Sequence, residues 1–222
     1  MPKLSACVIT YNEESKIAAC LESLVGVADE IVIVDSESSD NTVQIAAQFT
    51  DRILTQPFLG YVAQKNLAVD RASHDWILSL DADEQLSEQL RSEILEEKDR
   101  LGQHAGYEMP RRTFYVDRWM DHCWYPDRKI RLFDRRRARW AGVDIHESVR
   151  VAEGSVKSLR GDILHRTCDS VSDHLQTIDR FSEIAAHKLF RQGRRTSALW
   201  PLTASAAAFV RLFVLKRGFL DG

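Results

Sequence analysis

The chain has 222 residues, of which 44% are hydrophobic and 28% charged, with a formal net charge of −3. These values describe an ordinary globular protein with a sizeable core, one large domain or one domain with an appendage. The net charge gives no reason to expect a nucleic-acid partner. The charge is uneven, however, because residues 184–220 hold seven Lys or Arg and no Asp or Glu, which predicts a locally basic surface facing something anionic.

The four cysteines are scattered and form no CxxC pair; they are Cys7, Cys20, Cys123 and Cys168. This spacing argues against a disulfide framework and against a structural zinc site, and a reducing cytoplasm is the natural compartment. The first residues run directly into a predicted strand, so we expect no signal peptide.

The first half alternates strands and helices. We expect strands at 4–10, 31–34, 52–54 and 76–80. We expect three helices, one after Asn12, one at 43–49 and one at 60–72, and Asn12 can cap the first of them. The strands are apolar throughout rather than alternating, which predicts an α/β fold with a mostly parallel sheet covered by helices on both faces.

Polar residues follow three of these strands. Tyr11 and Asn12 follow the first, Asp35 follows the second, and Asp81 and Asp83 follow the fourth. Ligands of such sheets bind beyond the carboxyl ends of the strands, so we expect a crevice there. Asp81 and Asp83 are two residues apart and could present oxygens to one Mg²⁺ or Mn²⁺. The alternative is a strand end followed by acidic residues that open a helix.

The second half has a different texture. We expect a helix with a charged outer face to begin at Ser87. Residues 111–139 then contain ten Arg or Lys against four Asp. Within them, residues 129–133 alternate as a strand would. Residues 173–192 return to a helical period. Neither a glycine-rich dinucleotide turn nor a P-loop is present. Nucleotide phosphates would therefore be neutralised by a metal on Asp81 and Asp83, with Asp35 accepting from a base N–H and Tyr11 stacking on its face.

Four segments of the first hundred residues match a known pattern in order and spacing. They are VITYNEE (8–14), VIVDS (32–36), SDNT (39–42) and LDADE (80–84). Together they resemble glycosyltransferase family 2, whose fold is GT-A: a Rossmann-like nucleotide-binding half, an acceptor-binding half and, here, C-terminal helices. The resemblance implies nucleotide-binding roles for Thr10, Tyr11, Asn12, Glu13, Asp35, Lys65, Asn66 and Asp81. It implies a metal on Asp83, with Asp81 beside the ribose or sharing that metal.

Segments of the second half narrow the resemblance to lipopolysaccharide and lipooligosaccharide core β-1,4-glucosyltransferases. They are WYPD (124–127), RLF (131–133), Trp140, HE (146–147) and GFLDG (218–222). This implies transfer of glucose from UDP-glucose to an inner-core heptose. Proteins of this group usually continue beyond the matching residues, which leaves open whether this chain is truncated after Gly222. The expected division is a nucleotide-sugar half at 1–102, an acceptor and catalytic half at 103–170, and a membrane-associating helical segment at 171–222.

An inverting sugar transfer needs a base for the acceptor hydroxyl and a group that stabilises the departing diphosphate. The resemblance makes Glu147 the first candidate base and Asp127 the second; the alternatives are a surface carboxylate paired with an arginine and a turn-forming Asp. His146 and His165 could complete the metal shell or could be structural. Arg128, Lys129 and Arg131 could contact the diphosphate or a phosphorylated acceptor.

Residues 198–215 are strongly apolar, but Pro201 and Arg211 interrupt them and basic residues flank them. A spanning helix needs about 20 apolar residues, so we expect an interfacial helix on an anionic membrane surface rather than a span. The alternative is a helix docked on the domain or on a partner subunit.

The prediction as a whole is a metal-dependent inverting transferase at the cytoplasmic face of the inner membrane. Its partners would be a nucleotide-sugar donor and a lipid-anchored glycan. Two alternatives stay open: a family 2 transferase with another donor or acceptor, such as a polyprenyl-linked glycan or a peptide, and a catalytically silent nucleotide-sugar-binding module.

Overall fold

The computed structural model describes residues 2–142, 147–168, 170–195, 197 and 199–221. It divides the chain into two compact units. The first unit comprises Met1–Arg111 and Asp127–His165, and the second comprises Arg112–Pro126 and Arg166–Gly222. The functional boundaries after residues 102 and 170 that we inferred from the sequence remain predictions.

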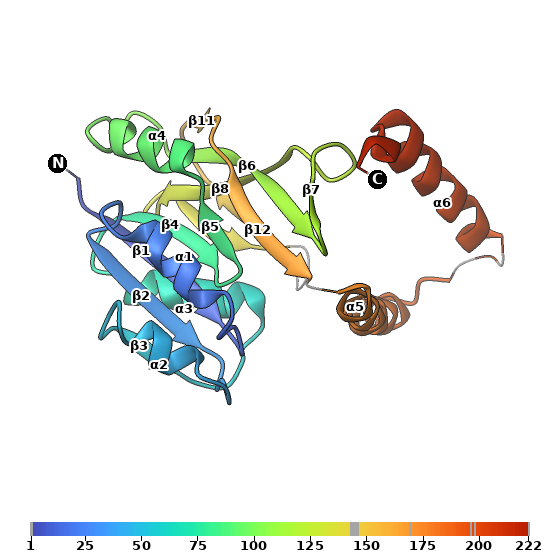
Figure 1. Ribbon diagram of the computed structural model, residues 1–222, viewed down its shortest axis with the longest axis horizontal. Helices are drawn as coiled ribbons and strands as arrows, with labels where there is room; N and C mark the ends of the chain where they lie inside the picture. The colour runs from blue at the N-terminus through green and yellow to red at the C-terminus, as the bar shows by residue number, and fades with distance from the viewer. Residues whose placement is uncertain (1, 143–146, 169, 196, 198, 222) are drawn as a thin grey trace. The chain divides into compact units, whose positions relative to one another are not determined.

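Four parallel strands form one side of the sheet in the first unit (Figure 1). They are β1 (Leu4–Thr10), β2 (Glu30–Asp35), β3 (Ile53–Thr55) and β4 (Trp76–Asp81), in the order β3-β2-β1-β4. Cys7 of β1 lies opposite Val32 of β2 and Ser79 of β4, so β1 is paired on both sides. Because the strands run in the same direction, their carboxyl ends lie at one edge, as predicted.

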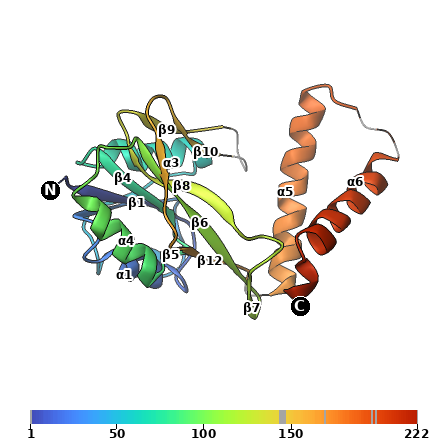
Figure 2. The same cartoon turned by 90° about the horizontal axis from the view of Figure 1, so that it is seen from above.

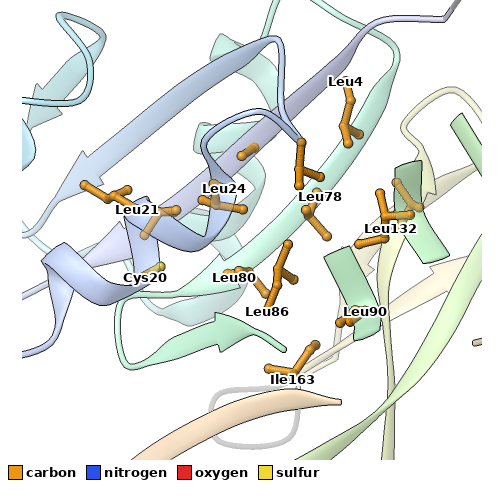
Figure 3. Packing of buried hydrophobic residues seen from close by; sticks show 14 of the residues in the cluster. Leu4, Cys20, Leu21, Leu24, Leu78, Leu80, Leu86, Leu90, Leu132 and Ile163 are labelled. Carbon is orange, nitrogen blue, oxygen red and sulfur yellow. The ribbon is translucent and has the colours of Figure 1, made fainter. Parts of the chain in front are cut away.

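Helices cover both faces of these strands. They are α1 (Ile17–Leu24), α2 (Thr42–Ala46), α3 (Tyr61–Arg71) and α4 (Glu88–Lys98). Leu21 and Leu24 of α1 pack in one cluster with Leu78 and Leu80 of β4 (Figure 3). A second cluster joins Ala68 and Val69 of α3 to Cys7 and Val32. The continuous apolar strands in the sequence follow from this burial on two faces.

The sheet continues beyond β4 with strands that the sequence only partly predicts. They are β5 (Glu84–Leu86), β6 (Gly106–Tyr115), β8 (Asp127–Asp134), β11 (Val156–Ser158) and β12 (Ile163–Cys168). β8 runs antiparallel to β4, with Leu132 opposite Leu78. A separate hairpin, β9 (Ala138–Ala141) and β10 (Ser148–Val151), places Trp140 opposite Val149. Only the strand at 129–133 was expected in this region.

β12 brings a distant segment to the acidic residues after β4. It pairs antiparallel with β5, and His165 lies opposite Glu84. The turn before β12 passes against the start of α4, where a Cβ on Gly161 would come within 2.3 Å of the Leu90 backbone nitrogen. Only glycine fits this approach. The close packing of Gly161 therefore fixes where β12 begins.

The second unit contains β7 (Arg118–Met120), α5 (Val171–Arg191), α6 (Trp200–Phe209), a π-helical turn (Val210–Leu215) and a 3₁₀ turn (Gly218–Leu220). Figure 2 shows α5 and α6 as two separate helices. The Asp221 carboxylate accepts N–H bonds from the backbones of Asp121, His122 and Cys123 at 3.0, 3.3 and 2.9 Å. Burial raises the pKa of Asp221, but these donors outweigh it and lower that pKa to about 2. Among the described residues, no helix has the length and apolar character needed to cross a bilayer.

Two local expectations are wrong. Asn12 does not cap the first helix, because α1 begins at Ile17 with Lys16 at the N-cap and no side-chain cap bond. The second helix ends at Ala46 rather than at residue 49. By contrast, Ser87 caps α4 by accepting the Leu90 N–H, as a helix start at this serine requires.

Candidate active site

The loop after β1 is tied to the loop after β2 by side-chain bonds. The side-chain oxygen of Asn12 accepts the Ser39 N–H at 2.8 Å, and the Asn12 N–H donates to the Ser38 hydroxyl at 2.8 Å. The Glu13 N–H donates to Thr42 at 2.8 Å. Asn12 has a φ of +53°, a conformation that Asn tolerates better than most residues. The polar residues after β1 therefore tie two loops together at the carboxyl rim of the sheet.

Thr10, Tyr11 and Asp35 lie at this rim in three different environments. The buried Thr10 hydroxyl has no hydrogen-bond partner among the described residues. Tyr11 is exposed, which leaves its ring accessible to a ligand. Asp35 is fully buried and accepts from the Ser38 N–H and hydroxyl at 3.0 and 2.5 Å. The nucleobase of a ligand could reach Asp35 only if the loop that carries Ser38 moved.

Asp81, at the end of β4, is paired with two cations. Lys65 Nζ lies 3.0 Å from its Oδ1, and Arg131 Nη2 lies 3.0 Å from its Oδ2. Burial raises the pKa of Asp81, but the attraction of Lys65 and Arg131 outweighs it and holds that pKa well below its usual range. Arg131 is itself buried and also contacts Glu84 at 2.7 Å. Arg131 is therefore held by Asp81 and Glu84 through Nη2, and the diphosphate contact considered for it stays a prediction.

Asp83 has a different partner from Asp81. Its Oδ2 lies 3.1 Å from Nε2 of His165, and both side chains are partly exposed. Among the described residues, no group of three His, Cys, Asp or Glu side chains could hold a metal ion. One carboxylate and one imidazole nevertheless suit Mn²⁺ or Mg²⁺, which take their remaining ligands from water and phosphate. The ligands that Asp83 and His165 offer fit a cation that also binds a diphosphate. His146, the other histidine expected near the metal, lies outside the described residues.

Glu147 meets the same lysine as Asp81. Its Oε1 lies 3.0 Å from Lys65 Nζ, and its side chain is mostly buried. The Trp140 ring lies 4.4 Å from Lys65 Nζ, and Asn66 donates to the Trp140 carbonyl at 2.9 Å. Lys65 and Asn66 therefore contact the β9–β10 hairpin.

Asp127 lies at the other end of the same set of charges. Both Nε and Nη2 of Arg111 donate to Asp127 Oδ2, at 3.1 and 2.7 Å, and Lys129 lies 3.0 Å from Oδ1. Burial raises the pKa of Asp127, but Arg111 and Lys129 outweigh it and lower that pKa. We call the following set the charge series. Its members are Glu147, Lys65, Asp81, Arg131, Glu84, Arg111 and Asp127, which alternate in sign and are joined by contacts of 3.3 Å or less.

Sequence reasoning missed Glu84 and Arg111 as members of this set. Glu84 is fully buried, accepts from Arg131 and Arg111, and receives the Asp81 N–H at 3.1 Å. The sequence did contain a signal for this ion pair. Glu84 is the third acidic residue of the LDADE segment, and a carboxylate that becomes buried needs a cation. Nothing local identifies which arginine supplies it.

Comparison with known proteins shows the family. The model of glycosyl transferase family 2 matches residues 5–151. An uncharacterized glycosyltransferase of Rickettsia typhi is 30% identical over 233 residues, covering 100% of this chain and 80% of that protein. The lipopolysaccharide core biosynthesis glycosyltransferase LpsC of Rhizobium meliloti is 30% identical over 230 residues, covering 96% and 82%.

A solved structure shares the fold. Glucosyl-3-phosphoglycerate synthase from Mycobacterium tuberculosis, in complex with Mn²⁺ and UDP-glucose, superimposes with a TM-score of 0.50 at 17% identity, covering 88% of this chain and 81% of that one. The family model spans well over half of the chain. The protein therefore belongs to glycosyl transferase family 2 and has the GT-A fold.

Proposed function

We propose that this glycosyltransferase is an inverting hexosyltransferase that moves glucose from UDP-glucose to an inner-core heptose of lipopolysaccharide. The name of the Rhizobium meliloti relative supports the acceptor class. The UDP-glucose bound by the structural relative supports the donor. The proposed catalytic chemistry rests on the contact between Glu147 and Lys65.

Glu147 is the proposed base because, among the residues that the structure describes, Lys65 contacts one of its oxygens, Oε1. Oε1 is fixed by Lys65, and Oε2 is left to accept the proton of the acceptor hydroxyl. As that proton moves to Glu147, the acceptor oxygen bonds to the anomeric carbon of the sugar. The bond from that carbon to the diphosphate breaks, and its electron pair leaves with the diphosphate. One displacement of this kind inverts the anomeric configuration.

The donor would lie along the carboxyl ends of β1, β2 and β4. We assign the nucleoside to Thr10 and Tyr11, where a hydroxyl with no partner among the described residues and an exposed ring lie at the end of β1, and to Asp35 once the Ser38 loop moves. Asp83 and His165 would hold Mg²⁺ or Mn²⁺, which supplies positive charge to the departing diphosphate. Asp81 remains a candidate for the ribose, although its two cations compete with a metal for its oxygens.

We further propose that the second unit binds the anionic surface of the cytoplasmic face of the inner membrane. α6 has no buried residue, and it is followed by a turn with exposed apolar side chains. The exposed set consists of Leu199, Trp200, Leu202, Phe209, Val210, Phe213, Val214 and Leu215. Basic residues on either side suit anionic headgroups. Such docking would bring the enzyme to a lipid-anchored acceptor.

The test of the base is Glu147→Gln, which keeps the shape of the side chain and its contact with Lys65 but removes the proton acceptor. We expect glucose transfer to fall by about 10²–10⁴-fold, the range of general-base catalysis. UDP affinity, measured by titration calorimetry with Mn²⁺ present, should change less than about threefold because Glu147 is outside the assigned nucleoside contacts. Wild-type transfer rates in this variant would remove Glu147 as the base. A wild-type protein that binds UDP-glucose and transfers nothing to any glycan, lipid or peptide acceptor would instead favour the silent binding module.

A further inference from the structure

Two adjacent residues of α3 hold the β9–β10 hairpin, and this hairpin carries Glu147 at the start of β10. Lys65 contacts Glu147 and the ring of Trp140, while Asn66 donates to the Trp140 carbonyl. Trp140 lies on β9 and pairs with Val149 on β10. Both strands of the hairpin are therefore anchored to one turn of one helix.

Carboxylate oxygens of Glu147 and Asp81 surround the Lys65 ammonium, which donates hydrogen bonds to both side chains. Its Nζ lies 3.0 Å from Glu147 Oε1, 3.0 Å from Asp81 Oδ1 and 3.2 Å from Asp81 Oδ2. An ammonium has three N–H donors, and three carboxylate oxygens surround this one. The side chain is 3% exposed, and its cation faces the Trp140 ring. At least two of its three N–H groups are therefore engaged by the carboxylates of Glu147 and Asp81.

Two cations of the charge series lie against the Trp140 ring. The Arg131 guanidinium lies 5.1 Å from its ring centroid, and Lys65 lies 4.4 Å from it. Trp140 is also nearly buried, so its faces are not open to a sugar. Its place among these contacts fixes the hairpin against α3 and limits where Glu147 can lie.

We propose that Lys65 is a positioning residue for Glu147, and that Asn66 assists it by fixing Trp140. Lys65 holds Oε1 and so orients the carboxylate, which aims Oε2 at the acceptor hydroxyl. Asp81 fixes Lys65 in turn, because it holds the ammonium from the end of β4. The nucleotide-binding role expected for Lys65 and Asn66 is replaced by this one. The inference rests on the proposed function, in which Glu147 is the base.

The test separates kcat from donor affinity in Lys65→Met, Lys65→Arg and Asn66→Ala. Lys65→Met should lower kcat by about 10²-fold, the cost of misplacing a reacting group by about 1 Å. Its KM for UDP-glucose and its Kd for UDP should stay within about threefold of wild type. Lys65→Arg should recover part of kcat because it keeps a cation between Asp81 and Glu147. Asn66→Ala leaves no buried charge unpaired, and it should lower kcat by about tenfold with unchanged donor affinity.

Lys98→Met is the matched control. Lys98 pairs with Asp29 at 2.8 Å, just before β2 begins and hence at the opposite edge of the sheet from the site. This variant should keep wild-type kcat. If Lys65→Met does not fold, Lys65→Arg and Asn66→Ala still decide the question.

Three outcomes are distinct. Loss of donor affinity at unchanged kcat in the Lys65 and Asn66 variants would overturn the positioning role and return both residues to nucleotide binding. Wild-type kcat in Lys65→Met and Asn66→Ala would overturn it as well. An inactive wild type, or a fully active Glu147→Gln, would be a failure of the proposed function itself.

Discussion

Glu147 and Asp127, the two carboxylates that the sequence singles out as bases, lie at opposite ends of the charge series. Glu147 has one cation, Lys65, on one of its oxygens. Asp127 has Arg111 on one oxygen and Lys129 on the other. Brønsted behaviour makes a carboxylate with a lowered pKa a weaker base, so Asp127 is the less suitable candidate and we propose Glu147. Asp127 serves instead as the counterion of Arg111, which also holds Glu84.

Asp127→Asn tests this assignment. The amide keeps one acceptor for Arg111 and loses the charge, so we expect kcat to fall by less than about tenfold, against about 10²–10⁴-fold for Glu147→Gln. Initial rates of UDP release for the two variants, measured in parallel, make the comparison. A loss in Asp127→Asn as large as that in Glu147→Gln, with the fold intact by circular dichroism, would reverse the assignment.

At the residue scale, local spacing predicted the edge of the sheet but not the partners of its side chains. Asp81 and Asp83 lie where the apolar strand ends, as expected. Although they are two residues apart, their partners among the described residues differ. Asp81 is paired with Lys65 and Arg131, and Asp83 is paired with His165. Those partners come from a helix and from strands far along the chain. Their pairing depends on tertiary register, which hydrophobic periodicity does not encode.

At the scale of elements, strands with continuous apolar runs were predictable, and short antiparallel strands were not. β12 is positioned by the contact of Gly161 with α4, which no local pattern reveals. α6 was expected as part of one helix over 198–215, and the described part changes to a π-helical turn at Val210. The apolar character that motivated the membrane prediction is carried by exposed side chains in both segments.

The membrane proposal predicts that α6 and the turn after it bind vesicles through apolar insertion and basic flanks. Leu202 and Leu215 are 70% and 74% exposed, so Leu202→Ser combined with Leu215→Ser should leave the fold intact. We expect this double variant to weaken binding to phosphatidylglycerol vesicles by at least about fivefold, because it removes inserted apolar side chains. Arg194→Gln combined with Arg195→Gln should weaken binding by at least as much, since each basic residue near the surface is worth about 1 kcal/mol. Flotation assays at constant salt measure the effect.

Leu95→Ser is the control, because Leu95 is an exposed apolar residue of α4 in the first unit. It should bind vesicles as wild type does. Equal binding by the wild type and both double variants, or no binding to anionic vesicles at all, would contradict the interfacial role. A stable dimer in solution that the double leucine variant dissociates would assign this surface to a second copy of the chain.

At the scale of the whole molecule, the α/β class, the parallel strand core and the placing of the strand ends at one edge all followed from the sequence. They followed because burial on two faces leaves a continuous apolar signal, and because parallel strands place their carboxyl ends together. The division into two units did not follow. The segment Arg112–Pro126 groups with the C-terminal helices rather than with its neighbours in sequence, because Asp221 binds its backbone. Such long-range capping by a single carboxylate has no periodic signature.

The most direct measurement is UDP release from UDP-glucose by the wild-type protein with a lipid-anchored inner-core glycan as acceptor. We expect turnover with Mn²⁺ or Mg²⁺, loss of turnover with EDTA, and a fall of at least about 10²-fold in Asp83→Ala, which leaves His165 without its carboxylate partner. A panel of other nucleotide sugars should give slower release. Release that is unaffected by EDTA and by Asp83→Ala, or the absence of release from every nucleotide sugar of the panel, would contradict a metal-dependent glycosyltransferase site at Asp83.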